Sequence, residues 1–120
     1  MKTVLRGTGK SVTIAGDGPT VILGERINPT GKKKLAASLL AGNLDLVRQE
    51  ALGQVQAGAD ILDVNVGAAG VDEVALLPKA VKLVLETVEV PLCIDTPDGD
   101  ALVAALDVHK NLNPPMAGLW

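Results

Sequence analysis

The stretch ILDVNVG, residues 61–67, places two polar side chains in a run that otherwise has the composition of a buried β-strand. Strand side chains alternate between two faces, so Asp63 and Asn65 share one face, while Leu62 and Val64 point to the other. An unpaired polar group in an apolar interior costs about 2–7 kcal/mol, so something must hydrogen-bond this pair. Protein groups, water or a ligand could do so.

Acidic and amide side chains also end two other apolar runs. The run 20–25 ends in Glu25 with Arg26 and Asn28 just after it, and a later run ends in Asp95. Ligands bind at the carboxyl ends of the strands in parallel α/β folds, because loops and helix N-termini converge there. We therefore predict a site built from three strands by Glu25, Asn28, Asp63, Asn65 and Asp95. In the alternative, Glu25 and Arg26 pair with neighbouring charges and the other residues cap the following helices.

The elements that position these residues alternate short apolar runs with amphipathic stretches, which is the pattern of βαβ units and a parallel sheet. Strands are predicted over residues 20–25, 60–66 and 90–95. Helices are predicted over residues 32–42 and 43–58, after the loop 67–73, and after residue 98. The segment 3–18 predicts a β-hairpin that plugs one end of the sheet. The fold class is thus α/β, with a hairpin, three βα units and a parallel sheet left open.

Helical spacing also predicts which side chains face the core. In the helix after residue 73 the apolar face is Val74, Leu77, Val81, Val84 and Val88, and in the last helix it is Leu102, Val103 and Leu106. Asn43 and Asp98 are placed to cap their helices, and Pro78 is tolerable only in a first turn. His109 is expected to be partly solvated at a helix end, and the run Lys32–Lys34 to form a solvated face.

Composition disfavours several classes of partner. Hydrophobic residues make up 48% of the 120 residues, but Phe and Tyr are absent and Trp120 is the only aromatic residue. Stacking of nucleic-acid bases is therefore disfavoured. The net charge of −3 and a pI near 5.0 provide no basic field for a phosphate backbone or an anionic membrane. We expect neither a nucleic acid nor a membrane as a partner.

Cysteine usage and the N-terminus predict a cytoplasmic protein. Cys93 is the only cysteine, which excludes an internal disulfide and a cysteine-cluster metal site and fits a reducing compartment. The start MKTVLRGTGK has no apolar core of a signal peptide, and no run reaches the length of a membrane helix. The motif GTGKS at 7–11 is not a nucleotide-binding loop, because the full pattern needs glycine where Val4 stands.

The last residues do not continue the pattern. Residues 111–120, NLNPPMAGLW, contain two adjacent prolines and a glycine, which predicts an irregular tail after a domain over residues 1–110. Three parallel strands do not close a sheet, and an exposed edge invites association. We therefore expect a partner, a homo-oligomer or membership of a larger protein.

Three stretches together resemble a known family. ILGERINPTGKKKL, GADILDVNVGAAGVDEVALLP and VPLCIDT, in this order, resemble the first three βα units of the pterin-binding TIM-barrel family. Within it they are most similar to methyltetrahydrofolate:corrinoid methyltransferases and to the folate domain of cobalamin-dependent methionine synthase. The resemblance covers residues 20–110 and implies the N-terminal part of a (β/α)8 barrel.

The resemblance implies an activity and a role for each predicted site residue. Such enzymes transfer the N5 methyl of methyltetrahydrofolate to a cobalamin or other corrinoid carried by a partner protein, so no metal is implied on this chain. Asp95 would accept hydrogen bonds from the 2-amino group and ring N–H of the pterin. Asp63 and Asn65 would line the same pocket, with Glu25 and Asn28 at its edge. No catalytic residue is implied, because the family residue that contacts N5 lies on a later strand.

Two alternatives remain open at this point. A dihydropteroate synthase-like enzyme shares the barrel, although the first strand here ends in GERINPTG, where that enzyme shows a loop like NVTPDSF. A family barrel has about 250 residues, so the 120 residues are also expected to be an N-terminal fragment that could be catalytically inactive.

Overall fold

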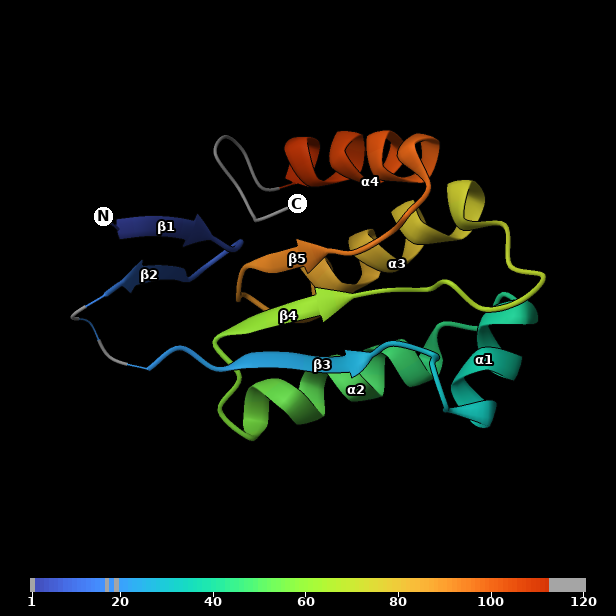
Figure 1. The fold of residues 1–120 in the computed structure, drawn as a ribbon, viewed down its shortest axis with the longest axis horizontal. Helices are drawn as coiled ribbons and strands as arrows, with labels where there is room; N and C mark the ends of the chain where they lie inside the picture. The colour runs from blue at the N-terminus through green and yellow to red at the C-terminus, as the bar shows by residue number, and fades with distance from the viewer. Residues whose placement is uncertain (1, 17, 19, 113–120) are drawn as a thin grey trace.

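The chain folds as an α/β structure with two small sheets, as the computed structural model describes it for residues 2–16, 18 and 20–112. Strands β1 (Lys2–Arg6) and β2 (Ser11–Ala15) form an antiparallel hairpin. Strands β3 (Leu23–Ile27), β4 (Ile61–Val64) and β5 (Leu92–Ile94) form a parallel sheet in that order (Figure 1). This confirms the predicted class, hairpin and open parallel sheet.

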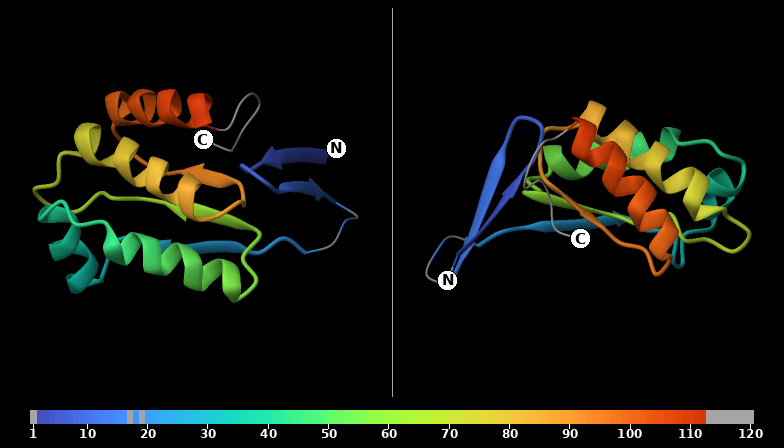
Figure 2. Two further views of the ribbon diagram at one scale, coloured as in Figure 1. Left: turned by 180° about the vertical axis from the view of Figure 1, so that it is seen from behind. Right: turned by 90° about the horizontal axis from the view of Figure 1, so that it is seen from above.

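Four helices follow the parallel strands, two of them between β3 and β4. They are α1 (Lys33–Leu40), α2 (Asp45–Gln56), α3 (Glu73–Thr87) and α4 (Gly99–Leu112). Helices α2 and α3 lie behind the parallel sheet in Figure 1, α4 packs along α3, and Figure 2 shows the same layers from two other sides. The other face of the sheet carries no helix among the described residues. None of these helices is both long enough and apolar enough to cross a bilayer.

The alternation of β4 divides the core from the open face. Leu62, Val64 and Val66 are fully buried and belong to the apolar core between sheet and helices. Asp63 and Asn65 point to the opposite face, which is the one without helices. This confirms the predicted assignment of faces. Side chains alternate along a strand, so burial of the two valines directs Asp63 and Asn65 to the other face.

Strand β3 contains a bulge that the sequence did not indicate. Gly24 is opposite Leu62, but Ile27 is opposite Val64, so β3 has one more residue than β4 over this stretch. The bulge turns Ile27 to the helix face, where it is fully buried. The strand also starts and ends later than the predicted range 20–25.

Gln54 of α2 holds the bulge in place. Its Oε1 accepts a hydrogen bond from the Arg26 N–H at 2.9 Å, and its Nε2 donates to the Glu50 carbonyl at 3.2 Å. Gly24 leaves room for this side chain, since a Cβ at that position would lie 2.5 Å from Gln54 Oε1. The irregular backbone of β3 is thereby satisfied by a polar side chain that is itself buried.

The hairpin lies at the amino ends of the parallel strands (Figure 1). The N–H groups of Gly9 and Lys10 both donate to the Glu89 carbonyl, at 3.3 and 3.0 Å, in the connection between α3 and β5. A Cβ on Gly7 would come 2.0 Å from the same oxygen, so the close approach requires glycine. The predicted hairpin therefore contacts the end of the sheet opposite to the predicted site.

Three details of the earlier helices differ from the prediction. Leu44, not Asn43, is the N-cap of α2, although Asn43 Oδ1 still accepts a hydrogen bond from the Asp45 N–H at 2.9 Å. Pro78 lies beyond the first turn of α3, where it removes one intrahelical hydrogen bond. Val74 is 41% exposed because the apolar face begins at Leu76.

Helix α4 differs more from its prediction. Its fully buried residues are Ala101, Ala105 and His109; Leu102 and Leu106 are partly buried and pack against the core as predicted, whereas Val103 is 61% exposed. Alanine at four-residue spacing lets α4 approach α3 closely, so the smaller residues rather than the valine face the core. His109 is 2% exposed, which contradicts the expected solvation. The helix also extends two residues past Lys110, to Leu112, and residues 113–120 lie outside the described residues.

Candidate functional site

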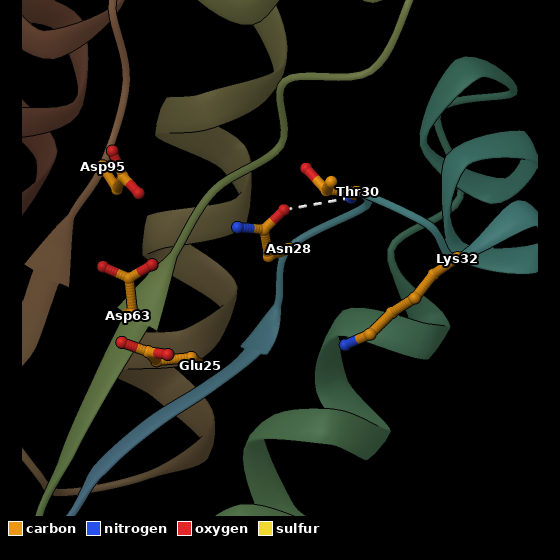
Figure 3. A pocket seen from close by; sticks show the side chains of 6 residues that line it. All are labelled: Glu25, Asn28, Thr30, Lys32, Asp63 and Asp95. Carbon is orange, nitrogen blue, oxygen red and sulfur yellow. Dashed lines mark hydrogen bonds between the residues drawn. The ribbon is translucent and has the colours of Figure 1, made fainter.

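A pocket of about 350 Å³ opens at the carboxyl ends of the parallel strands (Figure 3). Six residues line it: Glu25, Asn28, Thr30, Lys32, Asp63 and Asp95. Figure 3 shows that three carboxylates come from three adjacent strands or their ends. Four of the five predicted site residues therefore meet in one pocket, and Asn65 contacts it through Asp95.

Asp63 is the most buried acid of the pocket, at 8% exposed. Burial raises the pKa of this carboxyl above its usual value, and the nearby Asp95 and Glu25 carboxylates add to the rise. A hydrogen bond from the Cys93 thiol acts in the opposite direction. Asp63 is thus protonated more readily than an ordinary aspartate. Such a carboxyl can donate a hydrogen bond to a ligand when it is protonated and accept one when it is ionised.

Cys93 belongs to the same cluster and was not predicted. It lies opposite Asp63 in the β4–β5 register and is half-buried. Burial, together with the Asp63 hydrogen bond and charge, raises the pKa of Cys93 to about 12. The side chain is therefore a thiol that donates to Asp63 and not a thiolate nucleophile.

Asn65 links the ends of β4 and β5. Its Oδ1 accepts a hydrogen bond from the Gly67 N–H at 2.8 Å, which leaves the amide nitrogen to donate. That nitrogen, Nδ2, lies 3.4 Å from Asp95 Oδ2. Asp95 itself is exposed, so the rest of its carboxylate can accept hydrogen bonds from a ligand.

The connection from β3 to α1 forms the other wall. Asn28 Oδ1 accepts a hydrogen bond from the Thr30 N–H at 3.0 Å, which tightens the turn before α1. Lys32 Nζ donates to the Arg26 carbonyl of the bulge. Lys32 therefore lines the site and does not belong to a solvated helix face, whereas Lys33 and Lys34 are exposed as predicted.

For the residues that it describes, the structure does not show the alternative roles, in which Glu25 pairs with a neighbouring charge and the other strand-end residues cap the following helices. Asp72 caps α3 by accepting from the Ala75 N–H at 3.3 Å. Asp98 accepts from the first N–H groups of α4 at 2.9 and 3.2 Å, which confirms its predicted cap. Within the described part of the chain, Glu25 forms no ion pair. The strand-end carboxylates are thus available for a ligand.

The chemistry of the pocket is that of a hydrogen-bond acceptor. Three carboxylates and an amide face a space with one lysine on its wall, so N–H donors of a neutral or weakly basic ligand fit best. Among residues 2–16, 18 and 20–112, no group of three or more His, Cys, Asp or Glu side chains is arranged to hold a metal ion.

Comparison with known proteins relates the chain to one family and to a methyltransferase. The family described as pterin binding enzyme matches residues 24–113. The protein named methylcorrinoid:tetrahydrofolate methyltransferase from Eubacterium limosum is 37% identical over 93 residues, which cover 75% of this chain. The aligned part is 33% of that relative, so the chain spans about a third of its length.

Proposed function

The chain belongs to the pterin-binding enzyme family, and we propose that it binds a tetrahydrofolate for methyl transfer to or from a corrinoid on a partner protein. The relative's name describes transfer from a methylcorrinoid to tetrahydrofolate, whereas the resemblance in sequence suggests methyltetrahydrofolate as the donor. One site serves both directions, because a catalyst stabilises the same transition state from either side.

The observation that carries this proposal is the exposed Asp95 carboxylate beside Asn65 at the mouth of the pocket. The 2-amino-4-oxopyrimidine ring of a pterin presents two adjacent N–H donors. The two oxygens of one carboxylate match such a pair in parallel, as they match a guanidinium group. Asp95 would therefore anchor the pterin edge-on.

Asp63 would act deeper in the pocket. A carboxyl whose pKa is raised by burial can donate a hydrogen bond when protonated and accept one when ionised. Ring nitrogens of a pterin include both donors and acceptors, so Asp63 suits a ring nitrogen. The Cys93 thiol would keep one carboxyl oxygen oriented during this contact.

The methyl step itself needs a charge at N5 to be stabilised. A tertiary amine is a poor leaving group, so N5 must accept a proton or a strong hydrogen bond as the methyl leaves. The corrinoid supplies the cobalt that takes up or gives the methyl group. This chain's residues would hold the pterin in place, with Asn28 and Lys32 forming the pocket wall next to its edge.

The remaining features of the proposal follow from the same reasoning. We place the protein in the cytoplasm, where a single free cysteine and a corrinoid protein partner are compatible. The open parallel sheet with polar strand ends agrees with the first part of a (β/α)8 barrel, whose further strands would pair with the edges of β3 and β5.

Calorimetric titration with methyltetrahydrofolate tests the proposal. Asp95→Asn keeps the shape but replaces one acceptor oxygen by a donor, so binding should weaken about 10-fold to 150-fold, as expected for the loss of a charged hydrogen bond. Asp100→Asn is the matched control, because it removes an exposed carboxylate from the first turn of α4 outside the pocket. Its affinity should equal that of the wild type.

Two results would contradict the proposal. One is a wild-type protein that is folded by circular dichroism and does not bind methyltetrahydrofolate at millimolar concentration. The other is equal weakening by Asp95→Asn and Asp100→Asn, which would mean a general charge effect and not a contact with the pterin.

A further inference from the structure

We propose that Thr96 and Glu73 are a positioning pair that holds the Asp95 carboxylate in its pterin-binding direction. The inference rests on the proposed function, since it concerns the same carboxylate. Neither residue lines the pocket, and both would act through the backbone that follows β5.

The Thr96 hydroxyl connects two loops of the site. Its Oγ1 donates to Glu73 Oε1 at 2.9 Å and accepts a hydrogen bond from the Asp98 N–H at 3.2 Å. A hydroxyl has one proton, and the acidic partner can only accept it, so the direction of both bonds is determined. The half-buried position of both side chains protects these bonds from competing water.

Glu73 is a fixed anchor for this contact. It is the first residue of α3, directly after the Asp72 cap, where a negative charge is favourable at a helix N-terminus. A Cβ on Gly67 would lie 3.3 Å from Glu73 Oε1 and 3.1 Å from Asn65 Oδ1. The backbone of the β4–α3 loop thus runs between Glu73 and Asn65 and packs against both.

Asp95 depends on this arrangement because its own side chain is weakly held. Its N–H donates to the Val64 carbonyl at 3.0 Å, which fixes the strand side of the residue. The exposed carboxylate has a long contact with Asn65, at 3.4 Å, and also interacts with the neighbouring Asp63 carboxyl, which repels it when both are ionised. The loop side of Asp95 is fixed by the next residue, Thr96. Without the Thr96–Glu73 bond, the carboxylate would have to be ordered again at each binding event.

The cost of such ordering appears in the binding constant and not in the fold. Side chains and loops that are disordered before binding weaken the affinity, whereas a preorganised site does not pay this cost. We expect Thr96→Val, which keeps the β-branched shape and removes the hydroxyl, to weaken methyltetrahydrofolate binding about tenfold. Thr96→Ser keeps the hydroxyl and should bind within about twofold of the wild type.

A second substitution and a control separate this effect from general loss of packing. Glu73→Ala removes the acceptor and should weaken binding as Thr96→Val does, and the double variant should be little weaker than either alone. Thr87→Val is the matched control. Thr87 Oγ1 donates to the Leu83 carbonyl within α3 at 2.6 Å, so the same substitution there removes a hydroxyl away from the site and should leave the affinity unchanged.

Amide hydrogen exchange at Asp98 tests the pair independently of the ligand. The Asp98 N–H should exchange faster in Thr96→Val and retain its wild-type rate in Thr96→Ser. A wild-type protein that does not bind methyltetrahydrofolate would refute the proposed function. In that case the exchange rate of the Asp98 N–H would still test whether Thr96 and Glu73 hold the loop after β5. Wild-type affinity in Thr96→Val, or additive losses in the double variant, would overturn the positioning role.

Discussion

Gly24→Ala is the substitution that most directly tests how the site is built. A Cβ at this position would lie 2.5 Å from Gln54 Oε1 and 2.9 Å from Leu62 Cδ2, so the Gln54 side chain must move. That movement breaks the hydrogen bond from the Arg26 N–H and leaves the bulge of β3 without its partner. Glu25 lies within the bulge, so the pocket wall should shift as well.

The magnitude follows from two costs. Overpacking of a close contact costs about 1–3 kcal/mol, and an unsatisfied N–H in a part-buried position costs about 1–3 kcal/mol. Alanine also lowers the conformational entropy of the unfolded chain, which raises the free energy of unfolding by about 0.4–1 kcal/mol. We therefore expect the free energy of unfolding to fall by about 1–5 kcal/mol, and the affinity for methyltetrahydrofolate to fall with it.

Urea denaturation followed by far-UV circular dichroism measures this loss against a matched control. Gly53→Ala is the same substitution in the interior of α2, where a Cβ would meet nothing within 4 Å. It should raise the free energy of unfolding by about 0.5–1 kcal/mol. The two glycine substitutions should thus have opposite signs.

A third variant identifies the cause. With Gln54→Ala in place, the closest contact of the new Cβ at residue 24 is removed and the Arg26 N–H has already lost its partner, so Gly24→Ala should cost about 1 kcal/mol less than in the wild type. An equal cost in both backgrounds, or no destabilisation at all, would refute the role that we assign to Gln54.

Two further predictions concern buried titratable groups. Burial lowers the pKa of His109, so stability should be complete above its unfolded value of 6.5 and decrease as the pH falls below it. His109→Leu should remove this dependence in urea titrations between about pH 7.5 and 5. The pKa of Asp63 is raised, so its contribution to stability is present below the unfolded value of 3.8 and is lost as the pH rises through the folded value. At pH 7 the free energy of unfolding of Asp63→Asn should therefore be at least that of the wild type, although the variant should bind methyltetrahydrofolate more weakly. A lower free energy of unfolding in the variant would contradict this prediction.

The position of the pocket was predictable because it depends on two local rules. Alternation along β4 determined that Asp63 and Asn65 share the face opposite the core valines. The parallel arrangement then brought the carboxyl ends of the three strands to one edge, where Glu25 and Asp95 join them. Both rules require only the order of residues along the chain.

Other features depend on contacts that sequence patterns do not contain. The bulge of β3 exists because Gln54, far along the chain, satisfies the Arg26 N–H. Lys32 resembled its lysine neighbours, yet the turn after Asn28 directs it toward the Arg26 carbonyl. His109 is buried because the alanine face of α4 packs on α3, a choice that depends on the helix partner and not on the helix itself.

The order of strands in the parallel sheet has a consequence for synthesis on the ribosome. Because β3, β4 and β5 are neighbours in the same order as in the chain, each strand can join an edge that has already emerged. The β1–β2 hairpin is made before the parallel strands and forms from local contacts, but the carbonyl that accepts its hydrogen bonds belongs to Glu89. The hairpin thus cannot dock until the chain as far as Glu89 has been made.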